Sequence, residues 1–319
     1  MNFQQLRYVR EAVRRNFNLT EVANVLFTSQ PGVSKQIKDL EDELGVEIFV
    51  RHGKRLLGLT EPGKEILPVV ERMLLDGRNL RRIAEHFSSQ EQGGLTIATT
   101  HTQARYALPK VVHEFKAAFP RVHLSLRQAS PAQIVEMVMS GEADIGISTE
   151  ALDRSGLVTF PAYSWHHVVV VPEGHPLTRV HPLTLEALAE YPIVTYDEAF
   201  TGRSHIDAAF AAAGLAPDVV LTAIDADVIK TYVDVGLGVG IVASMAVDAR
   251  RDVGLTILDA GHLFESNTTR LGLRRGVFLR AYTYRFIEMF SRQLDEEKVR
   301  KALKEVLPGA DFRVEDRDG

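Results

Sequence analysis

The sequence contains no cysteine among its 319 residues and only one tryptophan. The lack of cysteine excludes disulfide bonds, thiolate nucleophiles and cysteine-ligated metals together. No stretch is apolar for long enough to span a membrane, and no membrane partner is expected. The N-terminal segment mixes charged and apolar residues and lacks the continuous apolar core of a signal peptide. These absences predict a cytoplasmic location.

The chain also lacks the net positive charge that is common among nucleic-acid-binding proteins, because its formal net charge is −5. The charge is uneven along the sequence. Residues 1–90 hold 14 Lys and Arg against 12 Asp and Glu, a net of +2, whereas the rest holds 23 against 30, a net of −7. A mildly basic first segment permits DNA binding, but charge alone does not indicate it.

The first 60 residues carry the pattern of three short helices. Apolar residues recur at helical spacing from Phe3 to Arg15. Thr20 is expected to cap a second helix, Glu21–Leu26, and Ser29 a third that begins at Gln30. Two short helices joined by a tight connection are typical of a helix-turn-helix, whose second helix lies in the DNA major groove.

The helix that begins at Gln30 has one buried and one outward face. Its buried stripe and its C-cap are expected at Val33, Ile37, Leu40, Leu44 and Gly45. The residues left facing outward are Gln30, Pro31, Ser34, Lys35 and Lys38. The alternative to a DNA-binding face is a plain helical bundle whose lysine face is solvated.

A basic turn follows, between two short extended segments. It consists of Arg51, His52, Gly53, Lys54 and Arg55. Such a turn is typical of a wing whose cations lie against phosphates or the minor groove. In order, the segment contains a helix, a capped turn, the SQPGVSKQI helix, ELG, IF and the basic wing. It resembles the LysR-type transcriptional regulators, without a gap from residue 3 to residue 60.

That resemblance implies a winged helix-turn-helix that works as a dimer on a palindromic site. The residues implied near base edges are Gln30, Pro31, Ser34 and Lys35, with Ser29 beside them at the start of the helix. The residues implied at phosphates are Lys38, Arg51, Lys54 and Arg55. Promoter DNA is the implied partner, with RNA polymerase as a further one.

A long amphipathic helix is expected from Glu61 to Phe87. A lone helix cannot bury such an apolar stripe on itself. It packs either against its own head or against a second copy of the chain, and the family resemblance favours the second copy. Pro68 is expected to bend or loosen its first turns. Residues 1–60 are thus the expected DNA-binding domain and 61–93 a linker and dimerisation helix with a flexible end.

From Leu95 onward, short β-rich runs alternate with amphipathic helices, which predicts α/β lobes with parallel sheets. Helices are expected at Thr102–Phe119, Pro131–Ser140, Arg203–Ala213, Val228–Leu237, Ala281–Phe290 and Glu296–Val306. The expected lobes comprise residues 94–164 with 266–306, and residues 165–265, with a ligand cleft between them. The tail, residues 307–319, is expected to be disordered and is assigned no function.

The segment Ile97–Pro109 places hydroxyls and an amide where a strand ends and a helix begins. Free backbone N–H groups at such a point favour an anion, and Thr and Gln side chains add neutral donors. Neutral donors suit an oxyanion that must bind and leave, because no fixed counter-charge traps it. Simple helix capping by Thr100 or Thr102 explains the pattern equally well.

The segments TTHTQARYALP, STEAL, FTGRS and DADVIKTYV resemble the CysB branch of the LysR-type regulators, and the similarity extends from residue 3 to roughly residue 290. The branch implies regulation, mainly activation, of sulfur-assimilation and cysteine-biosynthesis genes. It implies a body like a type 2 periplasmic binding protein and no cofactor. It also implies a homo-oligomer, either a dimer or a dimer of dimers, and acetylserine, adenylyl sulfate or sulfate as effector. Carried over by position, the effector site consists of Thr100, Thr102, Gln103, Thr149, Thr201, Gly202 and Arg203.

Trp165 stands at the expected crossing between the lobes. Packing at the hinge and contact with the effector explain it equally well. Two acids near the cleft, Asp197 and Glu198, allow a different effector preference within the branch, such as control linked to alkanesulfonates. The segment after Gln293 departs from the ending expected for the branch.

Other candidate sites fail on their sequence context. Gly236–Gly240 follows a helix and precedes a strand, the reverse of a dinucleotide fingerprint. His166 and His167 point to opposite faces of a strand and lack further ligands, so no metal site is expected. Asp225 is expected to cap a helix rather than to form a catalytic pair with Asp227. No motif in the sequence supports an enzyme. The DNA-binding head argues against a solute-binding protein of transport.

Overall fold

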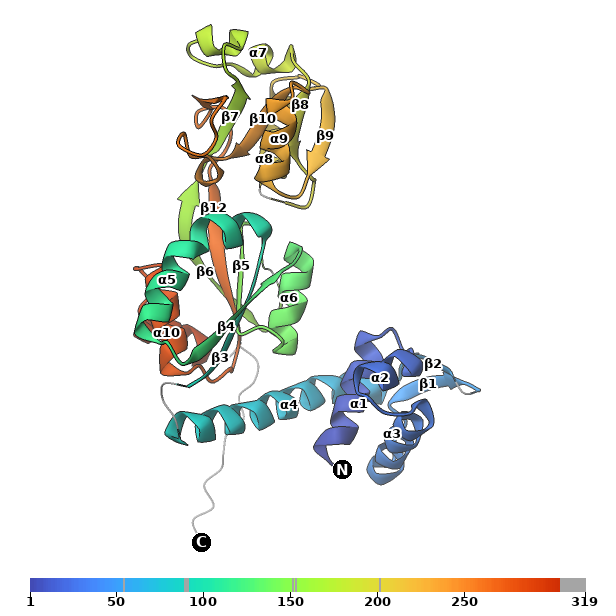
Figure 1. Ribbon diagram of the computed structural model, residues 1–319. Helices are drawn as coiled ribbons and strands as arrows, with labels where there is room; N and C mark the ends of the chain where they lie inside the picture. The colour runs from blue at the N-terminus through green and yellow to red at the C-terminus, as the bar shows by residue number, and fades with distance from the viewer. Residues whose placement is uncertain (54, 89–91, 151, 153, 201, 305–319) are drawn as a thin grey trace. The chain divides into compact units, whose positions relative to one another are not determined.

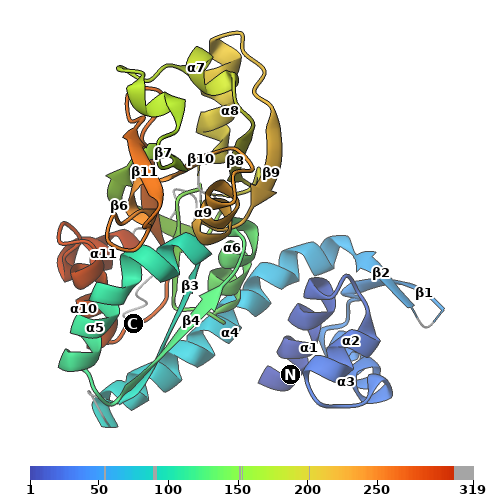
Figure 2. The same ribbon diagram turned by 45° about the horizontal axis from the view of Figure 1, so that its top comes forward.

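The computed structural model describes residues 1–53, 55–88, 92–150, 152, 154–200 and 202–304. They form two compact units, which we call the head (Met1–Phe87) and the body (Ser88–Gly319). Each unit has hydrophobic clusters of its own. Figure 1 labels their helices and strands, and Figure 2 turns the view by 45°.

The head is a helical domain with a two-stranded wing. Its elements are α1 (Phe3–Arg14), α2 (Leu19–Val25), α3 (Gln30–Leu44), β1 (Phe49–His52), β2 (Arg55–Leu59) and α4 (Glu61–Ser88). The strands pair antiparallel, with a register shift at Val50 and Arg51. The sequence-predicted helices α1 and α3, the Ser29 cap and the Gly45 C-cap are confirmed.

Two details of the predicted head are wrong. Asn18, not Thr20, caps α2, because its side chain accepts hydrogen bonds from the backbone N–H groups of Thr20 and Glu21. Leu44 is 41% exposed rather than buried, because the left-handed Gly45 (φ +71°) ends α3 where the core stops. The last buried position of α3 belongs instead to Glu41.

Helix α4 continues from the wing and is 28 residues long, with Pro68 inside it. Thr60 caps its start, because the Thr60 hydroxyl accepts a hydrogen bond from the Gly63 N–H at 3.0 Å. Val70 and Leu74 are buried in the core of the head, so the first half packs on its own unit. The second half leaves Leu80 68% exposed, which keeps a second copy as a candidate partner there.

The body contains two α/β lobes. Lobe I consists of β3 (Gly93–Thr99), η1 (Gln103–Ala107), α5 (Leu108–Ala118), β4 (Val122–Gln128), α6 (Pro131–Ser140), β5 (Ile145–Ser148), β6 (Leu157–Trp165), β12 (Asn267–Arg274), α10 (Ala281–Phe290) and α11 (Glu296–Lys304). Lobe II consists of β7 (His167–Pro172), η2 (Pro176–Arg179), α7 (Leu185–Ala189), β8 (Ile193–Tyr196), α8 (Arg203–Ala212), β9 (Val219–Ala223), α9 (Ala226–Asp234), β10 (Val239–Ala243), η3 (Ser244–Ala246) and β11 (Leu255–Asp259).

Both sheets are mixed rather than parallel as predicted. The strand orders are β4-β3-β5-β12-β6 and β11-β7-β10-β8-β9. In lobe I, β12 runs antiparallel to β5 and β6, and in lobe II, β7 runs antiparallel to β10 and β11. The reason is that the chain leaves lobe I through β6 and returns through β12, so these two long strands run side by side in opposite directions (Figure 1).

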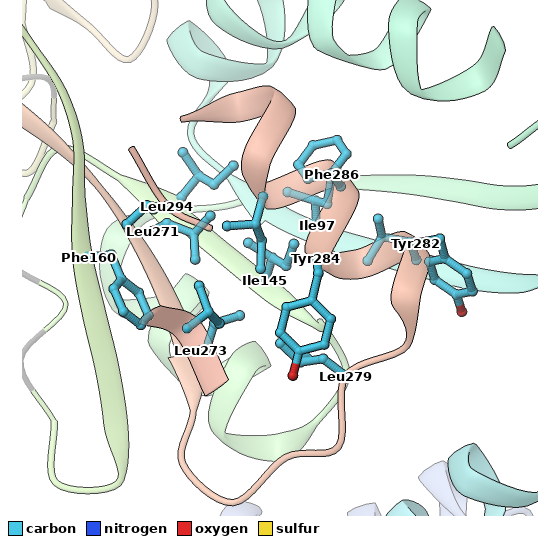
Figure 3. Packing of buried hydrophobic residues seen from close by; sticks show 14 of the residues in the cluster. Ile97, Ile145, Phe160, Leu271, Leu273, Leu279, Tyr282, Tyr284, Phe286 and Leu294 are labelled. Atoms are coloured by element: carbon cyan, nitrogen blue, oxygen red, sulfur yellow. The ribbon is translucent and has the colours of Figure 1, made fainter. Parts of the chain in front are cut away.

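The core of lobe I positions the carboxyl ends of its strands. Figure 3 shows Ile97, Ile145, Leu271 and Leu273 of the sheet packed against Phe286 of α10. The final helix, α11, buries Val299 and Leu303 in the same cluster, so it belongs to the lobe I core. The end of the expected helix Glu296–Val306 and the tail, 307–319, lie outside the described residues.

Candidate effector cleft and DNA-binding face

The predicted effector residues of lobe I gather where its strands end. Thr100 follows β3 and is 4% exposed, and Thr149 follows β5. Thr102 and Gln103 come next in the chain, at the start of η1, and are 1% exposed. These polar side chains are therefore largely withdrawn from bulk water. In the protein interior, hydrogen bonds are stronger and an unpaired polar group costs more free energy.

The Thr269 hydroxyl on β12 connects three of the predicted residues. It accepts hydrogen bonds from Gln103 Nε2 at 3.1 Å and from Trp165 Nε1 at 3.2 Å. Its oxygen also lies 3.5 Å from the Thr149 hydroxyl. Sequence reasoning missed Thr269, because only the pairing of β6 with β12 brings it to Trp165, 104 residues away.

Two phenols, the half-buried Tyr163 and the fully buried Tyr196, complete this neutral polar set. The Tyr163 hydroxyl donates to Gln103 Oε1, and burial raises the pKa of Tyr163 to about 12. Burial likewise raises the pKa of Tyr196, even though hydrogen bonds from the Ala243 backbone N–H and the Thr102 side chain lower it. Both phenols stay protonated at neutral pH, so the cleft contains hydroxyl groups rather than phenolates.

The predicted helix that begins at Thr102 starts instead as a π-helical turn, η1, which continues into α5. Thr102 stands at the cap position of η1 but its side chain makes no capping hydrogen bond. Its hydroxyl interacts with Tyr196 of lobe II instead. The capping alternative for Thr102 is therefore wrong. π-Helical turns are rare in proteins, and those that occur are often at functional sites.

The start of α8 faces these residues from lobe II. The Gly202 N–H donates to Glu150 Oε1 of lobe I at 3.1 Å. Gly202 adopts φ +68°, and a Cβ there would overlap Asn267 Oδ1. Asn267 is 1% exposed and its Oδ1 has no hydrogen-bond partner in the described part of the chain. Thr201 lies outside the described residues.

Arg203 was predicted to offer donors to the effector, but the structure uses them inside lobe II. Its backbone N–H donates to Phe200 O, and Nη1 donates to Tyr196 O at 2.6 Å. Its Nε donates to Asp207 at 2.8 Å. The guanidinium therefore anchors the first turn of α8 to β8, and its bonded donors are used within lobe II.

The predicted DNA-binding residues lie on α3 and the wing. Ser29 accepts a hydrogen bond from the Gly32 N–H and fixes the start of α3. The exposed members of the set are Pro31, Lys35, Lys38 and Arg55, and the half-buried ones are Gln30 and Ser34. A hollow of about 400 Å³ lies beside the start of α2, and Gln30 of α3 and Arg55 of the wing contribute to its wall. Lys54 lies outside the described residues.

Arg51 differs from the other predicted phosphate contacts. Its guanidinium forms an ion pair with Glu41 at 2.6 Å. The other carboxylate oxygen of Glu41 accepts from the backbone N–H groups of Ile48 and Phe49. Glu41 is 6% exposed, so this buried carboxylate ties α3 to the start of the wing. Arg51 is thus a positioning residue of the wing, and sequence spacing gave no sign of the pair.

One group of side chains has metal-ligand spacing. Ligand atoms of His101, Asp225 and Asp227 lie within 4.8 Å of one another. Asp225 caps α9 as predicted, through the Val228 N–H at 2.9 Å. Asp227 already pairs with Arg105 and Lys230. These two cations oppose a divalent ion at the same carboxylate, so we assign no metal site to this group.

Two family models match the chain. The model described as "Bacterial regulatory helix-turn-helix protein, lysR family" matches residues 3–64, and the model described as "LysR substrate binding domain" matches residues 88–295. The chain belongs to the LysR family of bacterial transcriptional regulators. The expected family and fold class are confirmed.

The similar relatives belong to the expected branch. The transcriptional regulator SsuR of Burkholderia cenocepacia is 68% identical over 308 residues, which cover 96% of this chain and all of SsuR. CysB of the same organism is 57% identical, with 95% and 97% covered, and Cbl of Escherichia coli is 53% identical, with 96% and 97% covered. The relatives are regulators, and this LysR-type protein of the CysB, Cbl and SsuR group is likewise a regulator rather than an enzyme.

Solved structures agree with the fold. The cofactor-binding domain of Cbl superposes with a TM-score of 0.66 at 49% identity, covering 67% of this chain and 95% of that domain. Full-length CbnR in complex with its target DNA superposes with a TM-score of 0.57, covering 92% and 99%, but at 19% identity it shows only a shared fold. In the described part of this LysR-type chain, no helix has the length and apolar character needed to cross a membrane.

Proposed function

We propose that this regulator senses a small oxyanion or an acetylserine-like molecule between its lobes and thereby controls sulfur-assimilation genes, mainly as an activator. The observation that supports the proposal is the convergence of buried neutral donors. Gln103, Trp165 and the half-buried Thr149 meet at Thr269, and Thr100 precedes Gln103 by three residues. Hydroxyl and amide groups stabilise an oxyanion by hydrogen bonds without a fixed positive charge.

The proposed mechanism is a shift between two arrangements of the lobes. The cleft residues come from both lobes, since Thr102 of lobe I contacts Tyr196 of lobe II. A ligand that touches both lobes stabilises the arrangement that it fits, and the coupling to DNA equals its difference in affinity for the two arrangements. Sulfate, adenylyl sulfate and acetylserine are the proposed effectors, with no cofactor.

A second candidate is control of alkanesulfonate-related genes in the same branch. The observation that favours it is the higher identity to SsuR, 68%, than to CysB, 57%. The two candidates share the cleft and differ in the genes and the effector. Comparing footprints on the promoters of sulfate-assimilation and alkanesulfonate genes, each with and without sulfate and acetylserine, distinguishes them.

The cleft proposal is tested with Thr100→Val, which removes the hydroxyl and keeps the shape. We expect calorimetry to show loss of sulfate and acetylserine binding, and mobility shifts to show unchanged promoter binding without effector. Thr222→Val is the control, because Thr222 is an exposed residue of β9. Loss of promoter binding in Thr100→Val would instead make Thr100 a structural residue.

We further propose that the protein acts on promoter DNA as a homo-oligomer, a dimer or a dimer of dimers, with RNA polymerase as a later partner. The support is the exposed apolar surface on the second half of α4. Leu80 is 68% exposed, although it belongs to the apolar stripe of a helix whose first half is packed in the core of the head. Sedimentation of Leu80→Glu tests this: a mass unchanged from wild type contradicts α4 as the contact.

A further inference from the structure

The half-buried Glu150 bridges the two lobes. Its Oε1 accepts a hydrogen bond from the Gly202 N–H at 3.1 Å, at the start of α8 in lobe II. Its Oε2 accepts from the Ser148 hydroxyl at 2.8 Å, at the end of β5 in lobe I. We call this arrangement of Ser148, Glu150 and Gly202 the Glu150 bridge. Glu150 is not among the residues predicted for the effector site.

The start of α8 is an anion position that the helix does not fill with a side chain of its own. Its N-cap residue is Gly202, which makes no side-chain capping hydrogen bond. The N–H groups of Arg203 and His205 are bonded to Phe200 O and Gly202 O, so the Gly202 N–H is the donor that meets the anion. The helix macrodipole favours a negative charge there. In the structure that charge is the carboxylate of Glu150, supplied by the other lobe.

A second observation indicates that the same point is built for a ligand. Asn267 lies against Gly202, is 1% exposed, and its Oδ1 has no hydrogen-bond partner within the described ranges. A buried acceptor without a donor is costly, and rotation of its amide or a ligand donor would satisfy it. A carboxylate and a sulfate ion carry only acceptors, so neither satisfies Asn267 Oδ1. Rotation of the amide exchanges Oδ1 and Nδ2 and presents a buried donor to an oxyanion at this point.

We propose that Glu150 is a tethered competitor of the effector: its carboxylate holds the oxyanion position at α8, and an anionic effector must displace it to bind. This inference rests on the proposed effector function and adds to it a residue that sets affinity and couples the lobes. When the effector oxyanion takes the Gly202 N–H, the direct bridge between lobes is replaced by one that runs through the ligand. Glu150 then also sets which anions bind, because it repels those of higher charge more strongly.

The first test needs no ligand. In the full-length protein, hydrogen–deuterium exchange of the first turn of α8 should be faster in Glu150→Ala than in wild type, because the Gly202 N–H loses its acceptor. Glu142→Ala is the matched control, since Glu142 is an exposed carboxylate of the same lobe. Equal exchange in wild type and Glu150→Ala overturns the Glu150 bridge.

The second test measures sulfate binding by calorimetry at constant ionic strength. Glu150→Gln keeps the shape and removes the charge, so its affinity for sulfate should exceed that of wild type by roughly tenfold, or about 1.4 kcal/mol. Equal or weaker sulfate binding overturns the competition and makes Glu150 a ligand contact or a structural residue. If neither protein binds sulfate or acetylserine while exchange still rises in Glu150→Ala, the effector function fails and the bridge itself is upheld.

Discussion

The Thr269 hydroxyl is the group on which the hydrogen bonds of the predicted effector site depend most. Thr269→Val preserves the volume of the side chain but leaves the Gln103 amide and the Trp165 indole N–H without their acceptor. Because both donors are buried, we expect a loss of about 2–4 kcal/mol in the free energy of unfolding. Urea unfolding checks this, and the fluorescence of Trp165, the only tryptophan, reports it directly.

Thr268→Val is the control for that substitution. Thr268 is the neighbouring residue on β12, and its hydroxyl faces the exposed Ser164 hydroxyl at 3.2 Å. Water can replace that contact, so we expect a change within about 0.5 kcal/mol. Equal losses in the two variants would show that the Thr269 hydroxyl has no special role.

Gly202 is required for two separate reasons, and a matched pair of variants separates them. In Gly202→Ala, the left-handed φ of +68° costs about 1–2 kcal/mol, and the new Cβ overlaps Asn267 Oδ1 as well. In Gly214→Ala, φ is +70° and nothing lies within 4 Å, so only the backbone cost remains. Thermal unfolding should show the larger loss for Gly202→Ala, and sulfate binding should fall in that variant alone. Equal unfolding temperatures would contradict the clash.

The residues of the cleft were only partly predictable from sequence. Resemblance gave Gln103 and Thr149, and the position of Trp165 at the lobe crossing made it a candidate. The structure brings all three to one hydroxyl. Thr269 and Glu150 were missed, because their roles depend on partners that only tertiary structure supplies. A threonine within a strand or a glutamate after one has no distinctive local pattern, so spacing along the chain does not reveal it.

At the scale of elements, periodic patterns predicted well and strand direction did not. The helices Pro131–Ser140 and Ala281–Phe290 begin and end at the predicted residues, since Ser130 caps the first and Gly141 ends it in the left-handed conformation. The strands Leu157–Trp165 and Leu255–Asp259 were not predicted. The sheets are mixed because the chain crosses between lobes twice, and local sequence carries no information on direction.

The junction of α3 and the wing should depend on one buried carboxylate. Glu41→Ala leaves the Ile48 and Phe49 N–H groups and the Arg51 guanidinium without their acceptor. We expect a loss of about 2–4 kcal/mol in the stability of the head, because two buried backbone N–H groups lose their acceptor. Calorimetric unfolding of the full-length protein measures it.

Asp42→Ala is the control for the wing, since Asp42 is the next acid on α3 and is exposed. A second readout is promoter affinity below the unfolding temperature. If the wing is held by Glu41, affinity should fall in Glu41→Ala and stay unchanged in Asp42→Ala. A Glu41→Ala protein that is as stable as wild type would show that the Glu41 carboxylate does not stabilise the junction of α3 and the wing.

At the scale of the whole molecule, the lobes are joined by a second polar group besides the Glu150 bridge. Arg105 and the Tyr106 hydroxyl of lobe I both contact the Asp227 carboxylate of lobe II, the hydroxyl at 2.6 Å. Lys230 of α9 lies 3.5 Å from the same carboxylate and 2.8 Å from Asp252. These polar contacts between the lobes can be exchanged for others, as a change of arrangement on effector binding requires.

This second group should make the association of the lobes dependent on pH. Burial raises the pKa of Asp227, but the hydrogen bond from Tyr106 and the charges of Lys230 and Arg105 outweigh burial and lower it. Because the folded-state pKa lies below the unfolded value of about 3.9, the stabilisation is present above that pH and is lost as pH falls through the folded pKa.

Asp227→Asn should therefore lower the unfolding temperature at pH 7, and the difference from wild type should shrink below about pH 4. Asp218→Asn, at an exposed residue that forms no ion pair within the described ranges, should match wild type throughout. A difference between Asp227→Asn and wild type that persists undiminished in acid would show that the carboxylate acts through its shape and not its charge.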